Sequence, residues 1–114
     1  MLVRDYKDVR QDDVETEGAD GVKIRWLITK EDGSPGFAMR EFELAPGGHT
    51  PYHSHGWEHE VFVLEGEGVV AGDAGEFPLE PGTVVFVPPD ENHNFKNTGE
   101  LPLRFLCLVP HGPK

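Results

Sequence analysis

Apolar and polar residues alternate along much of this chain, in short stretches separated by turn-forming residues. Such stretches, bounded by Gly, Pro, Asn and Asp, are typical of β-strands. The pattern predicts strands at Val22–Thr29, Phe37–Leu44, His59–Glu65, Thr83–Val87, His93–Asn97 and Leu103–Val109. Turns are predicted at Glu31–Gly36, Ala45–Gly48, Gly72–Gly75, Glu80–Gly82, Pro88–Asn92 and Asn97–Gly99. No stretch repeats its apolar residues at the helical period, and the charged segment Arg10–Asp20 is predicted as a loop, so we expect an all-β barrel.

Side-chain alternation also predicts which residues of a strand face the core. In Phe37–Leu44 the more apolar set comprises Ala38, Arg40, Phe42 and Leu44. Arg40 is therefore expected to point inward, either because it has a functional role or because its charged head reaches the rim of the barrel. In Leu103–Val109 both alternating sets are largely apolar, and periodicity alone leaves the orientation of that strand open.

The chain is acidic and of a length that suits one domain. Its 114 residues include 10 Lys and Arg and 21 Asp and Glu, which gives a formal net charge of −11. This charge argues against nucleic-acid binding, which needs a basic surface. No apolar run approaches the roughly 20 residues of a membrane span, and residues 1–5 lack the apolar core of a signal peptide. The single cysteine, Cys107, excludes an intrachain disulfide, so we expect a soluble cytoplasmic protein with no membrane or nucleic-acid partner.

Histidines carry the clearest chemical signal. His53 and His55 are two residues apart, so on an extended chain their imidazoles project from the same face. His59 opens the next predicted strand, and His93 follows the Pro88–Asn92 turn, from where closure of a barrel could bring it opposite the others. Neutral imidazoles suit a divalent first-row transition metal, which the sequence therefore predicts as a cofactor.

Two longer motifs surround these histidines. The first runs from Gly47 to Gly66 around His53-Ser54-His55 and His59, and the second runs from Gly82 to Asn97 around Pro88, Asp90 and His93. In order and spacing they resemble the two motifs of the cupin family, with His59 in the usual place of a glutamate and Asp90 in that of a glycine. The resemblance implies a single cupin domain over residues 1–114, a double-stranded β-helix or jelly-roll barrel, with strands of residues 1–46 flanking the motifs.

Carried over by position, the resemblance implies four metal ligands, which are His53, His55, His59 and His93. The arrangement is similar to the small four-histidine manganese cupins of bacteria. It implies one divalent transition metal per chain, with Mn or Fe first and Zn, Ni, Co or Cu as alternatives. Glu60 is an alternative to His59 as a ligand, but neighbouring residues of a strand point to opposite faces, and the even spacing from His55 favours His59.

A pocket beside the metal is also expected. If His93 points inward, Phe95 does too, and similar small cupins turn the face of Phe105 and Cys107 toward the pocket. Arg40 completes the set of candidate catalytic or pocket residues, in which it would neutralise an anionic or enolate substrate. For Phe95 and Phe105 the alternative is ordinary core packing, and for Cys107 it is a buried inert thiol.

Several functions are compatible with such a site. The leading hypothesis is a metal-dependent oxidoreductase of the dioxygenase type, which acts on a small organic substrate, anionic ones included, with O₂ or a peroxide. The alternatives are a non-catalytic small-molecule binding or sensing module and an isomerase or lyase that uses the metal as a Lewis acid. We also expect a homodimer, because the barrel exterior would carry the apolar side chains of Phe62, Leu64, Leu106 and Leu108.

Overall fold

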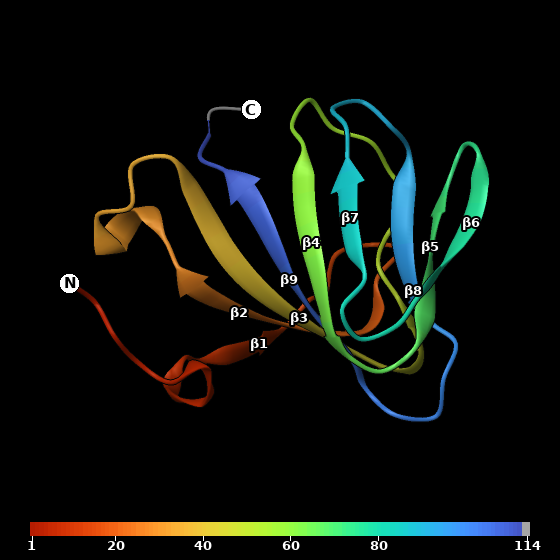
Figure 1. Ribbon diagram of the computed structural model, residues 1–114, viewed down its shortest axis with the longest axis horizontal. Helices are drawn as coiled ribbons and strands as arrows, with labels where there is room; N and C mark the ends of the chain where they lie inside the picture. The colour runs from red at the N-terminus through yellow and green to blue at the C-terminus, as the bar shows by residue number, and fades with distance from the viewer. Residues whose placement is uncertain (113–114) are drawn as a thin grey trace.

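The computed structural model describes residues 1–112 and is built from β-strands joined by short connections (Figure 1). Among these residues there is no α-helix, and no helix is long and apolar enough to cross a membrane. Two short 3₁₀ turns occur, η1 (Tyr6–Asp8) and η2 (Lys30–Asp32). The strands are β1 (Gln11–Asp13), β2 (Asp20–Ile28), β3 (Phe37–His49), β4 (His59–Glu65), β5 (Gly68–Gly72), β6 (Gly75–Leu79), β7 (Val84–Val87), β8 (His93–Asn97) and β9 (Leu103–Pro110). The all-β prediction is confirmed.

The strands form one strongly curled antiparallel sheet. Its order is β6-β5-β8-β3-β9-β4-β7, with β2 paired to β3 and β1 paired to β2. Figure 1 shows that the sheet curls into a half-barrel. Apolar residues from both ends of the sheet, such as Val70 of β5 and Val87 of β7, belong to the same buried cluster. The inner face of the curled sheet therefore surrounds the core, which has Leu44, Leu103 and Phe105 among its most buried side chains.

Most of the predicted strands and faces agree with the structure. Ala38 and Leu44 of β3 are buried, and Phe42 packs on the core with its ring 5.4 Å from that of Phe105. Strand β9, whose orientation periodicity left open, buries Leu103, Phe105 and Cys107 and leaves the alternate residues half-buried.

Three short strands were not predicted. Gln11–Asp13 lies in the segment predicted as a loop, yet it pairs with β2, with Gln11 opposite Arg25. Strand β1 lies at the edge of the sheet, and its residues Gln11–Asp13 are all polar. It is held by backbone pairing, so its sequence has no apolar alternation from which a strand could be predicted. Strands β5 and β6 form a hairpin around the predicted Gly72–Gly75 turn, and each has only five residues, with glycines at the ends and Pro78 within β6.

The predicted turn Ala45–Gly48 is wrong, because these residues continue strand β3 through a bulge. The pairing of β2 with β3 jumps from Val22↔Leu44 to Asp20↔His49, so four residues of β3 bulge outward there. Gly47 has a φ of +79°, and a Cβ on Gly48 would lie 2.8 Å from two backbone carbonyl oxygens, so the bulge requires glycine. Beyond the bulge, the end of β3 pairs with β8, with His49 opposite Lys96.

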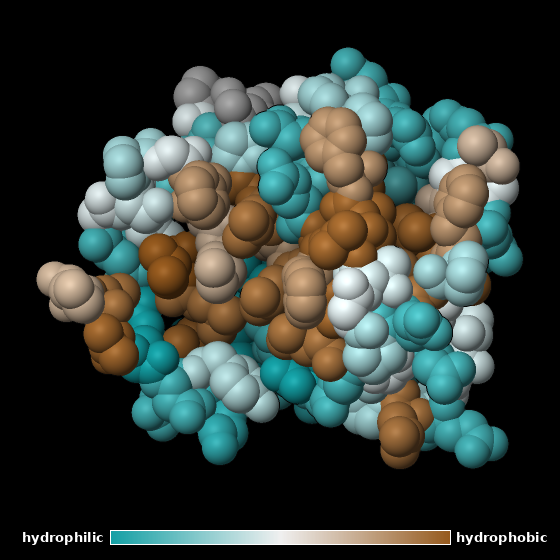
Figure 2. Space-filling view, viewed as in Figure 1, coloured by the Kyte–Doolittle hydropathy of each residue, from teal (hydrophilic) through white to brown (hydrophobic). Residues whose placement is uncertain are grey.

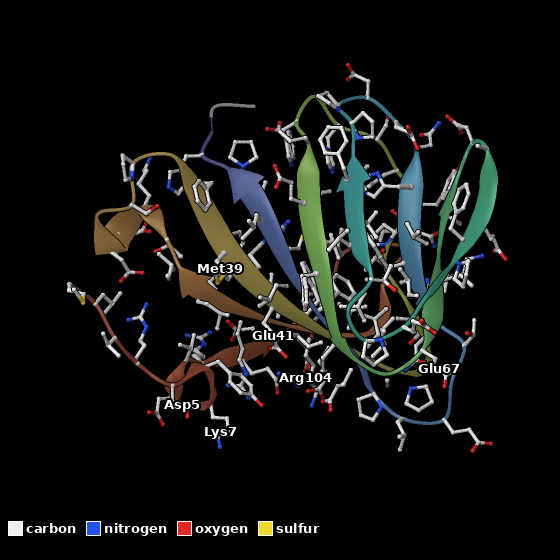
Figure 3. All side chains as sticks on the ribbon, in the orientation of Figure 1. Asp5, Lys7, Met39, Glu41, Glu67 and Arg104 are labelled. Atoms are coloured by element: carbon white, nitrogen blue, oxygen red, sulfur yellow. The ribbon has the colours of Figure 1, made fainter. Side chains whose placement is uncertain are left out.

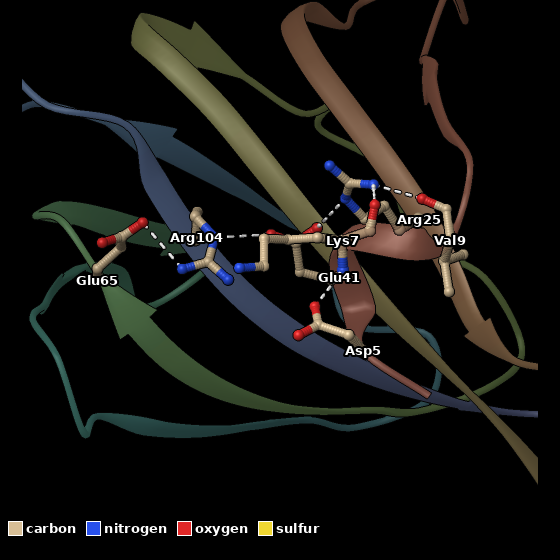
Figure 4. Close-up of polar contacts among 7 residues, drawn as sticks. All are labelled: Asp5, Lys7, Val9, Arg25, Glu41, Glu65 and Arg104. Carbon is tan, nitrogen blue, oxygen red and sulfur yellow. Dashed lines mark hydrogen bonds and ion pairs between the residues drawn. The ribbon is translucent and has the colours of Figure 1, made fainter. Parts of the chain in front are cut away.

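The outer face of β3 contains a buried carboxylate. Glu41 is 1% exposed and accepts a hydrogen bond of 2.8 Å from Nε of Arg104, while Nε of Arg25 lies 3.6 Å from its other oxygen (Figures 3 and 4). The ring of Tyr6, from η1, lies 4.8 Å from the Arg104 guanidinium and 5.6 Å from that of Arg25. Side-chain alternation puts Glu41 on the outer face, and the N-terminal segment then covers it.

A second part of the outer face is apolar and uncovered. Figure 2 shows apolar residues gathered over β3, β9, β4 and β7. Phe62 is 47% exposed, Phe86 62% and Val84 71%. Around them is a shallow groove lined by Met39, Glu60, Val61, Phe62, Val84, Val85, Phe86, Leu106 and Leu108. This face includes Phe62, Leu106 and Leu108 of the surface predicted to support a homodimer.

Candidate metal centre

Three of the predicted metal ligands meet at one point. His53, His55 and His93 each offer one ligand atom, and these atoms all lie within 4.8 Å of one another. His53 and His55 lie in the connection between β3 and β4, and His93 is the first residue of β8. The backbones of His53 and His93 bond to each other twice, at 3.2 and 2.9 Å, which holds the two loops together. This triad could therefore hold a metal ion.

Hydrogen bonds prepare two of these imidazoles for a metal. Nδ1 of His55 lies 2.9 Å from the carbonyl oxygen of Trp57, and Nδ1 of His93 lies 2.9 Å from that of Glu91. Because a carbonyl can only accept, each Nδ1 carries the hydrogen and each Nε2 keeps its lone pair, an arrangement common among metal-binding histidines. The Trp57 indole also stacks on His55, with ring centres 4.2 Å apart.

The environment also favours neutral imidazoles at His53 and His55. Burial lowers the pKa of His53 and of His55 below the ordinary histidine value, and the neighbouring histidines lower the pKa of each further. Only a neutral imidazole has the lone pair that a metal needs. Three converging imidazoles, two of them with Nδ1 bonded to a carbonyl oxygen, thus fit a divalent transition metal of the kind that the sequence predicts.

The fourth predicted ligand, His59, lies beside the triad but has different partners. Its Nε2 is 2.9 Å from Nε2 of His55, and its ring centre is 5.3 Å from that of His93. Its Nδ1 faces Nη2 of Arg40 at 3.2 Å and Sγ of Cys107 at 3.4 Å. Burial, and then the charge of Arg40, lower the pKa of His59 to about 3. Ligation by His59 stays a prediction; Glu60, its alternative, is exposed and lines the outer groove.

The four histidines line a cavity of about 240 Å³. Apolar side chains line much of the rest, including Val22, Ile24 and a group of phenylalanine rings in which Phe95 lies 4.7 Å from Phe105. All the predicted pocket residues line this one cavity, namely Arg40, Phe95, Phe105 and Cys107. Val14, Thr16 and Pro51 also line it, and no motif or strand pattern in the sequence singles these residues out.

Arg40 and Cys107 form a polar contact within the cavity wall. Nη2 of Arg40 lies 3.0 Å from Sγ of Cys107, and the guanidinium carbon lies 5.5 Å from the ring centre of Trp26 and 5.0 Å from that of Phe42. Burial raises the pKa of the Cys107 thiol, although Arg40 opposes this shift, so the thiol is protonated at neutral pH. Arg40 thus holds parts of the wall together and also borders the space that a substrate would occupy.

The backbone conformation at Asp90 shows why the second motif usually has a glycine at this position. It has a φ of +69°, in the left-handed region that glycine adopts without strain. Its N–H donates a hydrogen bond of 2.7 Å to the carbonyl oxygen of His55. The left-handed turn therefore joins the loop before His93 to the loop that contains His53 and His55.

We expect the substitution Asp90→Gly to stabilise the metal-free chain by about 0.5–1 kcal/mol and to leave metal affinity unchanged, because it relieves the backbone strain and keeps the N–H. Asp90→Val should instead destabilise it by about 1–2 kcal/mol. Urea unfolding and metal titration of both variants check this. A tenfold loss of metal affinity in Asp90→Gly would show that the carboxylate itself supports the site.

Comparison with known proteins places these features in context. A family model described as a cupin domain matches residues 40–109. Among solved structures, the polyketide cyclase RemF from Streptomyces resistomycificus is similar over 100% of this chain and 82% of that chain, with a TM-score of 0.93 and 37% identity. An oxalate-binding protein of Thermotoga maritima is 31% identical over 94 residues, which cover 81% of this chain and 78% of that protein.

A glucose-6-phosphate isomerase of Pyrococcus abyssi is 42% identical over 82 residues, which cover 67% of this chain. The chain spans only part of some longer relatives, 42% of this isomerase and 60% of a matching protein from Arabidopsis thaliana. The names of these relatives describe a cyclase, an oxalate-binding protein and an isomerase, so the shared fold leaves the reaction open.

Proposed function

Because this chain belongs to the cupin family, we propose that its histidine cluster binds one divalent transition metal and that the pocket catalyses ring closure in a compact, largely apolar polyketone substrate. A metal held by His53, His55 and His93, with His59 as the predicted fourth ligand, would act as a Lewis acid toward a carbonyl oxygen. This proposal takes up the alternative of an isomerase or lyase with a Lewis-acid metal, rather than the dioxygenase or the binding module.

One observation carries the proposal: three imidazoles offer ligand atoms within 4.8 Å of one another in the wall of a cavity of about 240 Å³ whose lining is otherwise largely apolar. The polar cluster fixes an oxygen atom of a ligand, and the apolar walls bind its carbon skeleton. Phe42, Phe95 and Phe105 offer ring faces to an aromatic or polyketone substrate and keep water away from it. The volume suits a compact molecule, or one end of a larger molecule that extends out of the pocket.

The likeness to the polyketide cyclase RemF supports this choice, since it covers the whole chain at 37% identity. The isomerase match covers 67% of the chain and the oxalate-binding match 81%. Oxalate and sugar phosphates carry at least one negative charge, and Arg40 is the one Lys or Arg that lines the cavity among residues 1–112. A largely apolar carbonyl compound fits these walls better than a small dianion does.

In this reaction the protein holds a poly-β-carbonyl chain in a folded shape. An α-carbon loses a proton and forms a carbon–carbon bond to a distant carbonyl carbon, whose oxygen takes up a proton to become a hydroxyl. That hydroxyl leaves with a neighbouring hydrogen as one water molecule for each ring that aromatises. Arg40 has five N–H donors, and Nη2 alone makes the contacts to His59 and Cys107. Its other donors can stabilise the enolate oxygen that develops, the role predicted for Arg40 from sequence.

The test is turnover of an aryl β-triketone probe by chain loaded separately with Zn, Mn, Fe, Co or Ni, with and without O₂. We expect a ring-closed product lighter by one water in both atmospheres, and no acceleration by the His93→Ala variant. Oxygen consumption with a product that gains oxygen atoms would support the dioxygenase hypothesis instead. Probe binding without turnover would support the binding module. Failure to bind any of these metals would overturn the proposal.

We also propose that the apolar outer face forms a homodimer contact. Phe86 and Val84 belong to β7, the edge strand of the sheet, and are more than half exposed. We expect Phe86→Glu to convert a dimer into a monomer, because it places a charge in an apolar contact. Phe77→Glu is the matched control, since Phe77 is 55% exposed on the β5–β6 hairpin. Sedimentation equilibrium measures both, and a monomeric wild-type chain at micromolar concentration would contradict the proposal.

A further inference from the structure

The connection between β1 and β2, residues 14–19, forms part of the cavity wall. Its residues Val14 and Thr16 line the cavity, together with Val22 of β2 and Pro51 of the loop that contains His53. This connection lies within the charged segment that the sequence predicts as a loop, and neither the metal site nor the pocket residues predicted from sequence include it. The β1–β2 connection is therefore a wall of the cavity whose function has still to be assigned.

Three kinds of contact hold the β1–β2 connection in place. The N–H of Val14 donates a hydrogen bond of 2.9 Å to the carbonyl oxygen of Val22. Gly18 has a φ of +92°, and a Cβ there would lie only 3.2 Å from Cβ of Pro51, so the backbone of the connection lies close against that proline. The side chains of Val14 and Ala19 pack against the hydrophobic core. The connection is thus anchored at both ends and near its tip.

The exposure of the lining residues shows where the cavity opens. Among the described residues that line it, only Thr16 and His53 are exposed, so the mouth of the cavity lies beside these two. Phe95 and Phe105 are at most 4% exposed and form part of its closed interior. Val14 is half-buried and two residues from Thr16, so it lines the cavity just inside the mouth. A ligand too large for the closed interior has to extend past Val14.

We infer that Val14 is a specificity-determining residue, whose side chain sets the largest ring system that the cavity accepts. The inference rests on the proposed function for its ligand class, an aryl ketone, and adds what limits the size of that ligand. One methylene group in an apolar pocket changes binding by about tenfold or more, so the size of one side chain is enough to select between ligands. Val14 is also outside the strand ladders, because β1 ends at Asp13, so its side chain can be changed without disturbing strand pairing.

The experiment compares two probes, acetophenone and 2-acetonaphthone, which share a methyl ketone and differ by one fused aromatic ring. A ¹H–¹⁵N NMR titration of the metal-free chain measures both dissociation constants, and shifts of the Val22 and Phe95 amides locate each ketone in the cavity. We expect Val14→Ala, which removes two methyl groups, to improve the affinity for 2-acetonaphthone relative to acetophenone about tenfold. Val14→Leu, which adds one methylene group, should shift this ratio in the opposite direction. Disorder of the connection would instead shift the ratio in the same direction in both variants.

Val85→Ala is the matched control. Val85 is also a half-buried valine that packs against the same core, but it lines the outer groove and not the cavity. It should keep the wild-type ratio of affinities. An equal shift in Val85→Ala, a ratio unchanged in both Val14 variants, or no binding of either ketone overturns the inference. Selective ketone binding without ring closure of the triketone would refute the proposed function alone, and ring closure with a ketone ratio that ignores Val14 would refute this inference alone.

Discussion

Replacing His93 by Ala is expected to lower metal affinity by at least about 100-fold and to abolish metal-dependent turnover, because it removes one of three donors that converge within 4.8 Å. The backbone bonds between His93 and His53 remain, since they involve only N–H and C=O groups. The fold should therefore persist. Elemental analysis after dialysis against a known free metal concentration measures the effect, and circular dichroism checks the fold.

His49→Ala is the matched control for this loss. His49 lies on β3, and its Nδ1 faces the carbonyl oxygen of Thr50 at 3.4 Å, outside the residues that line the cavity. It should bind metal as the wild type does. Equal affinities of His93→Ala and His49→Ala would show that the bound metal lies elsewhere.

The same assay tests whether His59 is the fourth ligand. His59→Ala should weaken metal binding if His59 is a ligand, whereas Glu60→Ala should have no effect, because Glu60 points to the outer groove. Equal metal retention by both variants would contradict the four-histidine assignment and leave the triad of His53, His55 and His93.

The strands that the sequence predicts correctly are those with one buried face. In β4, buried His59, Val61 and Val63 alternate with residues that are more exposed, and this is the signal that the alternation rule detects. Strand β1 is polar and held by backbone pairing, so no such signal exists for it. At Ala45–Gly48 the glycines allow a close approach of two backbones within a bulge. The same residue types are typical of turns, and for that reason the sequence pattern predicted a turn there.

The histidine cluster was predictable because the spacing within two motifs fixes which loops carry the imidazoles. The partners of those imidazoles were not, because they depend on the register of strands far apart in the chain. Arg40 pairs with Cys107 across β3 and β9, and Cys107 pairs with Val61 of β4. Only these two registers together bring Arg40 to His59. The sequence predicted Arg40 to point inward but could not show that it contacts a histidine.

The largest effect on stability is expected at Glu41, outside the candidate site. Glu41→Ala should lower the free energy of unfolding by about 3–5 kcal/mol, because it leaves the guanidinium groups of Arg25 and Arg104 without their buried partner. Glu65→Gln is the matched control, since Glu65 pairs with the same Arg104 at 2.9 Å but is 55% exposed. That variant should lose less than about 1 kcal/mol. Urea unfolding of the metal-free chain measures both.

Two outcomes would distinguish the causes of such a loss at Glu41. If the loss comes from uncompensated charge, replacing Arg25, Glu41 and Arg104 together by Met, Leu and Met should restore most of the stability, because apolar groups need no partner. If the cluster also anchors η1, the triple variant should remain less stable, because the ring of Tyr6 would lose both guanidinium contacts. In that case Tyr6→Ala should destabilise the wild type more than the triple variant. A Glu41→Ala variant as stable as Glu65→Gln would mean that the buried carboxylate gains no more from its two arginines than it loses by leaving water.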